Sequence, residues 1–221
     1  MVAHLKGLMK NELKTSAVSE VKLNFINQSG SENADVVVFQ KNEIPEYGQV
    51  VAWEVIRNCG RMDNHPFTYP STIYVSANDG YGNYTPQMYA EPGDTYAMVQ
   101  TLSGDQLVKT VDSANVTNVV VKNQLETSSI NANIYRGGKR LAIQTDIIPE
   151  QMAAFKFKPI IYMGVVPQVK EGEVMGPAIV SQIDTSFSLL GVSSADIIMT
   201  GGGSGPDAQL YAFVLDNVVM A

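Results

Sequence analysis

The chain is poor in the residues that build covalent or charged sites. Its 221 residues include one cysteine, Cys59, one tryptophan and two histidines, and charged residues make up only 17%. A single cysteine excludes an intramolecular disulfide framework. With a net charge of −7, the chain lacks the positive field that attracts phosphate groups. This argues against nucleic acid as a partner and against charge-driven binding to anionic lipid.

Long apolar segments are also missing. Runs such as IIYMGVV (160–166) are far shorter than the ~20 residues that a membrane-spanning helix needs, so we expect no transmembrane segment. The first residues, MVAHLKGLMKNELK, contain neither an apolar core nor a small-residue cleavage site, and therefore predict no signal peptide. We expect synthesis in the cytoplasm, with non-classical release as an open alternative.

Apolar residues make up 45% of the chain, and from residue 21 onward they alternate with polar ones. This alternation of period two is typical of strands with one buried face. It recurs at Val21, Leu23 and Phe25, at Val51, Trp53 and Val55, and at Leu210, Ala212 and Val214. Dense turn signals separate the segments. The sequence predicts an all-β fold, an antiparallel β-sandwich or jelly roll.

The two halves of the chain echo each other. Residues 23–42 match residues 119–138 at one constant offset, and VAWEV (51–55) then matches AAFKF (153–157). This match makes Trp53 and Phe155 equivalent core residues, and it leaves residues 57–70 as a loop inserted into the first copy. We therefore expect two related β repeats, 21–112 with the inserted loop and 113–221, packed as one compact unit.

The first twenty residues differ from the rest. Leu5, Leu8, Met9 and Leu13 fall on one helical face and lysines largely on the other, which predicts a short helical or flexible N-terminal arm. The arm could dock on its own chain, or reach a neighbouring subunit or a membrane surface.

Aromatic residues gather in the inserted loop and in the segment that follows it. Tyrosine rings stack on sugars, surround quaternary ammonium head groups and form hot spots between subunits. We expect a ligand- or partner-contact surface there, with a carbohydrate or a lipid head group as alternative ligands. Its residues are His65, Phe67, Tyr69, Tyr81, Tyr84 and Tyr89.

Residue sets that could carry chemistry are incomplete. Cys59, Asp63 and His65 contain the parts of a nucleophilic triad, but no family signature surrounds them. A metal site could be drawn from Asp63, His65 and Asp79, but the segment ANDGYGN (77–83) lacks the alternate carboxylates and the closing glutamate of a calcium loop. The glycine-rich segment TGGGSGPD (200–207) leads into a strand and not into the helix that a phosphate loop requires. We therefore predict no catalytic residue, no metal and no cofactor.

These observations favour a non-catalytic protein that acts by association. The leading hypothesis is a self-assembling structural subunit, a homo-oligomer, or a surface-binding module. One alternative is a membrane-active, toxin-like protein that uses the N-terminal arm and the aromatic loops. A less favoured alternative is a thiol hydrolase that uses Cys59 and His65.

Overall fold

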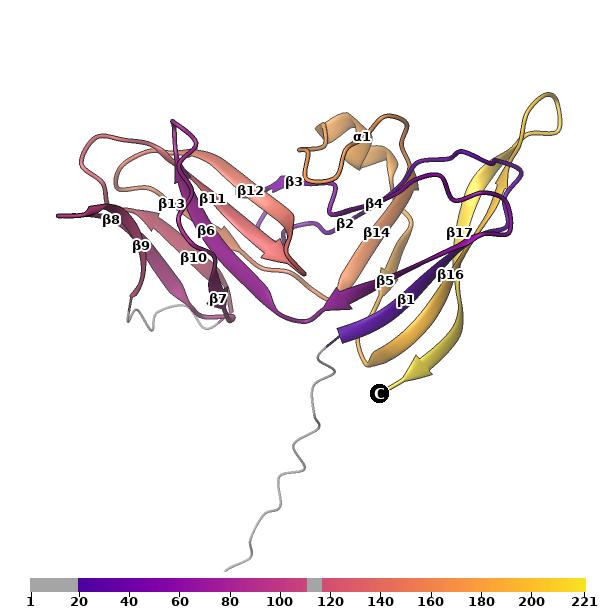
Figure 1. Cartoon of the computed structure of the whole chain (residues 1–221), viewed down its shortest axis with the longest axis horizontal. Helices are drawn as coiled ribbons and strands as arrows, with labels where there is room; N and C mark the ends of the chain where they lie inside the picture. The colour runs from indigo at the N-terminus through magenta and orange to yellow at the C-terminus, as the bar shows by residue number, and fades with distance from the viewer. Residues whose placement is uncertain (1–19, 111–116) are drawn as a thin grey trace, which may run out of the picture.

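The structure, a computed structural model, describes residues 20–110 and 117–221. The predicted N-terminal arm, apart from Glu20, lies outside the described residues. The predicted all-β fold is confirmed: the described residues form seventeen strands and one short helix, α1 (Pro177–Gln182). Figure 1 shows them in two lobes that lie side by side along the long axis of the molecule.

The terminal lobe contains the first and last strands of the described chain. One of its sheets has the order β17-β16-β1-β5 and the other the order β15-β14-β2-β4. These strands are β1 (Glu20–Asn27), β2 (Val36–Phe39), β4 (Glu54–Ile56), β5 (Asn64–Pro70), β14 (Ile160–Val165), β15 (Ser186–Ser188), β16 (Val192–Gly202) and β17 (Gln209–Met220).

The central lobe is built from the strands between β5 and β14, together with the short strand β3 from the β2–β4 connection. Its sheets have the orders β13-β10-β8-β9 and β3-β12-β11-β6-β7. The strands are β3 (Gln49–Val50), β6 (Ile73–Asp79), β7 (Met88–Ala90), β8 (Thr95–Thr101), β9 (Gly104–Thr110), β10 (Val119–Asn123), β11 (Ile130–Arg136), β12 (Lys139–Ile147) and β13 (Met152–Phe155). In each lobe two sheets pack face to face, as the alternating pattern requires.

The lobes do not follow the expected division of the chain into 21–112 and 113–221. The chain crosses from the terminal lobe to the central lobe between β5 and β6, and returns between β13 and β14 (Figure 1). The sheet of β1 therefore combines the first described strand with the last two. A sequence match between halves cannot show this, because it is silent on which strands pair.

Two buried asparagines hold equivalent turns in the two lobes. Asn27 at the end of β1 donates from Nδ2 to the carbonyls of Ser31 and Cys59, both at 2.8 Å, and its Oδ1 accepts the Ser29 N–H at 3.0 Å. Asn123 at the end of β10 donates to two carbonyls at 2.7 and 2.8 Å, and its Oδ1 also accepts the N–H two residues ahead. Each amide thus ties its turn to a distant loop.

Sheet register corrects two expectations about residues 51–70. Phe67 on β5 pairs with Leu23 on β1, whereas Phe155 on β13 pairs with Val119 on β10. Because Leu23 and Val119 are the residues that the sequence match equates, Phe155 corresponds to Phe67 and not to Trp53. Residues 64–70 form the strand β5, which pairs with β1 as β13 pairs with β10, so the prediction of an inserted loop over 57–70 is wrong. The sequence match failed here because VAWEV (51–55) and AAFKF (153–157) have the same apolar alternation but belong to strands with different pairing partners.

The extra segment of the terminal lobe lies instead between β2 and β4. In the central lobe the corresponding strands β11 and β12 are joined by Gly137 and Gly138, both with positive φ, at 59° and 77°. In the terminal lobe the connection includes β3, which pairs with β12 of the other lobe. The longer connection therefore links the lobes.

Polar contacts with backbone atoms fix the junction between the lobes. The Trp53 indole donates to the Arg136 carbonyl at 2.9 Å, and the Arg136 guanidinium donates to the Pro70 carbonyl. The Asn42 amide donates to the Ala154 carbonyl at 2.9 Å and accepts the Lys156 N–H at 2.8 Å. Because these bonds join side chains of one segment to backbone atoms of another, they fix the position of one lobe relative to the other.

We predict that Asn27→Ala and Asn123→Ala each lower the free energy of unfolding by about 2–4 kcal/mol, since each leaves several buried backbone groups without a partner. Urea denaturation monitored by Trp53 fluorescence measures the change. The matched control is Asn64→Ala on β5, where the asparagine is exposed. A loss below 1 kcal/mol for both buried asparagines, or an equal loss for Asn64→Ala, would contradict the assigned role.

Candidate functional site

The structure separates the predicted contact residues into two groups. His65, Phe67 and Tyr69 lie on β5 in the terminal lobe. Tyr81, Tyr84 and Tyr89 lie in the central lobe, in and after the loop that joins β6 to β7. They do not form one surface, so each group is considered by itself.

Phe67 and Tyr69 are core residues and not surface contacts. Both are buried, and their rings meet the Trp53 ring edge to face, with centroid distances of 6.4 and 5.8 Å. The Tyr69 hydroxyl receives a hydrogen bond from Gln40 at 3.2 Å, and burial raises the pKa of this tyrosine. Their inward positions follow from the pairing of β5 with β1, which directs every second side chain of β5 into the sandwich.

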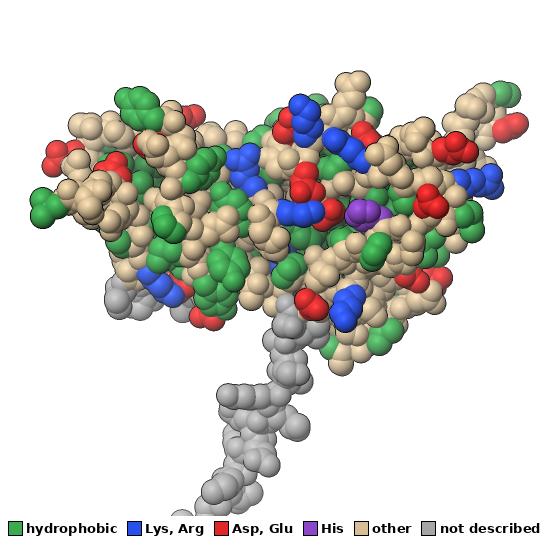
Figure 2. Space-filling model, in the orientation of Figure 1, with side chains coloured by type: hydrophobic (Ala, Val, Ile, Leu, Met, Phe, Trp, Pro, Cys, Tyr) green, Lys and Arg blue, Asp and Glu red, His purple; other side chains and the backbone are tan. Residues whose placement is uncertain are grey.

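His65 is half-buried, and Figure 2 shows the histidine side chain beside acidic and basic side chains. Its Nε2 lies 4.0 Å from Glu54 Oε1, and the other oxygen of Glu54 receives a hydrogen bond from Lys139 Nζ at 2.6 Å. Glu54 is thus shared between the two lobes. His65 thus lies beside a carboxylate that is bonded across the junction of the two lobes.

Cys59 is buried, and burial together with the charge of Asp63 raises the pKa of its thiol. The raised pKa disfavours the thiolate that nucleophilic chemistry needs. Among the described residues no three His, Cys, Asp or Glu side chains gather as metal ligands. Asp63 and His65 lie in the terminal lobe, whereas Asp79 ends β6 in the central lobe.

Asp79 organises the loop that carries Tyr81 and Tyr84. Its Oδ1 accepts the N–H groups of Tyr81 and Asn83, both at 2.9 Å, and its Oδ2 accepts the Asn83 amide at 2.8 Å. These bonds, that from the Asn83 side chain first, lower the pKa of the carboxyl. The carboxylate therefore serves the turn and is occupied by it.

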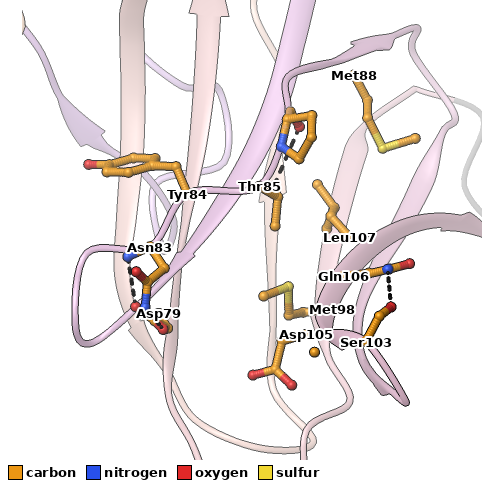
Figure 3. A pocket seen from close by; sticks show the side chains of 12 residues that line it. Asp79, Asn83, Tyr84, Thr85, Met88, Met98, Ser103, Asp105, Gln106 and Leu107 are labelled. Atoms are coloured by element: carbon orange, nitrogen blue, oxygen red, sulfur yellow. Dashed lines mark hydrogen bonds between the residues drawn. The ribbon is translucent and has the colours of Figure 1, made fainter.

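An open groove of about 500 Å³ lies between this loop and the β8–β9 hairpin (Figure 3). Tyr84 stands at one side with 56% of its surface exposed. Ser103, Asp105 and Gln106 line the other side, and Gln106 donates to the Ser103 hydroxyl at 3.0 Å. Met88, Met98 and Leu107 form the apolar part. An exposed aromatic ring at the rim, together with a carboxylate, an amide and a hydroxyl along the groove, suits a neutral polyhydroxylated ligand.

Tyr81 and Tyr89 lie outside this groove. Tyr81 is at the tip of the loop with 93% of its surface exposed. Tyr89 meets Tyr74 edge to face at 6.0 Å, and its hydroxyl donates to Glu91 at 2.9 Å. That hydrogen bond raises the pKa of Tyr89. The predicted tyrosines therefore do not form a cluster: Tyr84 lines the groove, Tyr81 lies at the loop tip, and Tyr89 pairs with Tyr74 on the surface.

The sequence missed a second exposed feature, the free edge of β17. This strand ends its sheet and pairs on one side only, with β16. Leu210, Ala212 and Val214, expected to face a core, face outward, whereas Tyr211, Phe213 and Leu215 face inward. The alternation could not decide the face, because both sets are apolar. Only the scarcity of charge in LYAFVLDNVVM (210–220), where Asp216 alone is charged, gave a signal.

No protein-family model, no curated protein and no solved structure matches this chain. Within residues 20–110 and 117–221, no helix is long and apolar enough to cross a membrane. The geometry described above is therefore the basis for assigning a function.

We predict that native Cys59 reacts with a chromogenic disulfide reagent at pH 7 about 100-fold more slowly than the same thiol in the urea-unfolded chain, because the buried thiol must first be exposed. The single cysteine makes the absorbance change specific. Reaction of the native protein faster than free cysteine would restore the thiol-hydrolase hypothesis.

Proposed function

We propose that the protein is a non-catalytic structural subunit that self-associates through the edge of β17. The observation that carries this proposal is the exposed, unpaired side of a twelve-residue strand. Leu210 has 93% and Val214 51% of its surface exposed. An open strand edge offers a row of N–H and C=O groups that another strand can pair with.

The other sheet edges are poor templates for pairing. β3, β4, β7, β13 and β15 have only two to four residues. β5 carries Pro66 and Pro70, and β9 carries Asp105 and Lys109. Short edges, prolines and charges are the usual devices against edge-to-edge association. β17 contains no proline, lysine or arginine, and Asp216 is its one charged residue.

A second copy of the chain fits this edge. Between Gln209 and Leu215 the strand pairs with β16, with one register shift between the pairs Thr200–Ala212 and Gly202–Gln209, whereas the positive φ of Asn217 lies beyond this segment. In an antiparallel pair about a two-fold axis at Ala212, Leu210 of one copy faces Val214 of the other. Asp216 then does not face its own copy. The segment is therefore complementary to itself in polarity, and its regular part from Ala212 to Leu215 offers backbone groups for pairing.

A second function, binding of a carbohydrate in the groove of Figure 3, is favoured by the position of Tyr84. Its exposed ring provides a stacking face, and Asp105 and Gln106 provide polar groups for hydroxyls. The groove and the β17 edge lie in different lobes, so a surface-binding module could also assemble. The membrane-active alternative draws no support from the described residues.

We predict a reversible dimer whose mass, measured by light scattering across a concentration series, is reduced to that of the monomer by Val214→Lys or Leu210→Lys, because lysine on an edge strand disfavours pairing and replaces the apolar contact between Leu210 and Val214 of the two copies. Higher salt is expected to strengthen the dimer, since each chain carries a net charge of −7.

The matched control is Leu102→Lys, which places the same charge on an exposed leucine in the β8–β9 turn. It is expected to leave the dimer intact. A wild-type monomer at the highest attainable concentration, or equal loss of the dimer in the control, would overturn pairing through β17.

For the groove, we predict that Tyr84→Ala lowers retention on an immobilised-polysaccharide panel about tenfold, because removing an aromatic stacking face costs about 1 kcal/mol or more. Tyr81→Ala, which removes the more exposed tyrosine outside the groove, should bind as the wild type does. Unchanged retention in Tyr84→Ala, or no retention of the wild type, would argue against this function.

A further inference from the structure

A second cavity, of about 650 Å³, lies beside the junction of the two lobes. Its walls come from the β5–β6 crossing, from β7 and from the end of β13. They are largely apolar and aromatic, formed by Ile73, Tyr89, Ala90, Pro92, Phe155 and Phe157. Arg136, at the end of β11, also lines this cavity.

Arg136 is a buried charge without a counterion. Only 5% of its surface is exposed. Its guanidinium donates to the Pro70 carbonyl and lies 4.4 Å above the Tyr69 ring centroid. Its Nε has no hydrogen-bond partner, and no carboxylate of the described chain forms an ion pair with it.

Such an arrangement is costly in a protein that binds nothing at this point. A buried charge usually has a partner of opposite sign, because desolvation of an isolated ion is expensive. Burial lowers the pKa of Arg136, because desolvation disfavours the charged form of the guanidinium. One neutral hydrogen bond and one ring face compensate it only in part. The cavity leaves space in which an anion can complete the site.

The other charged groups of the cavity are already engaged. Lys156 lies 3.4 Å from Glu43 across the junction. Glu91 accepts the hydrogen bond of the Tyr89 hydroxyl at 2.9 Å. Arg136 is therefore the main attraction for an anion, with Lys156 as a weaker contribution from the rim. A single buried guanidinium against apolar walls matches one carboxylate attached to an apolar group.

We propose that this cavity binds a small organic acid, with its carboxylate at Arg136 and its apolar body between Tyr89, Phe155 and Phe157. Inorganic phosphate lacks the apolar body and carries more charge than this site neutralises. The proposal is independent of association through β17, because the cavity lies at the junction and not at that edge.

Isothermal titration of the full chain with 1-naphthoate tests this proposal. The expected result is saturable binding with one site per chain, at least about tenfold tighter than that of the neutral 1-naphthamide or of inorganic phosphate. Arg136→Met should weaken naphthoate binding about tenfold or more. Lys156→Met should weaken it severalfold, whereas Lys158→Met, which removes the other lysine paired with Glu43 but not a cavity residue, should leave it unchanged.

Thr72→Glu covers the case in which Arg136→Met does not fold. Thr72 is exposed on the cavity rim, so the added carboxylate should repel naphthoate without disturbing the core. Thr68→Glu, exposed on β5 away from the cavity, is its matched control. Absence of naphthoate binding, equal binding in Arg136→Met or in Thr72→Glu, or phosphate binding as tight as that of naphthoate would each overturn the proposal.

Discussion

The two crossings of the chain between the lobes are the constraint on which the rest of the structure depends. Because β5 leads into the central lobe and β13 leads back, the two chain segments that form the sheets of the terminal lobe are separated in sequence by the central lobe. The crossing after β5 is held at Pro70 by the side chain of Arg136, whose own carbonyl is held by Trp53. One buried arginine thus serves both lobes. These bonds explain why Arg136 lies at the junction. They do not supply a counterion, and the neighbouring cavity has space for one.

The two lobes have one pair of similar turns and differ where they meet. Asn27 and Asn123 close corresponding turns with the same kinds of hydrogen bonds. The clear difference is the connection before β4, which in the central lobe is the turn at Gly137 and Gly138. The longer connection supplies β3, Asn42 and Glu43, all of which contact the central lobe. Its added length therefore stabilises the junction and does not form a free loop over the surface.

The sequence predicted the strand class and the core character of Trp53, since period two with one apolar face permits little else. It failed where the pattern is degenerate. VAWEV and AAFKF share an alternation, so the match could not show that Phe155 corresponds to Phe67. Both faces of β17 are apolar, so its outward side was taken for a core side. Phe67 and Tyr69 were grouped with exposed tyrosines because composition does not record pairing partners. Register and crossings are tertiary facts that local patterns do not contain.

The features that point to function are both uncompensated in the isolated chain. The edge of β17 leaves backbone groups open along an apolar strand, and Arg136 leaves a charge without a counterion. Selection against aggregation blunts open edges, as it has on the other edge strands here. A buried charge that has no ion-pair partner is costly, because no opposite charge offsets its desolvation. These two features are the observations from which a strand partner for the edge and an anion for the arginine are proposed.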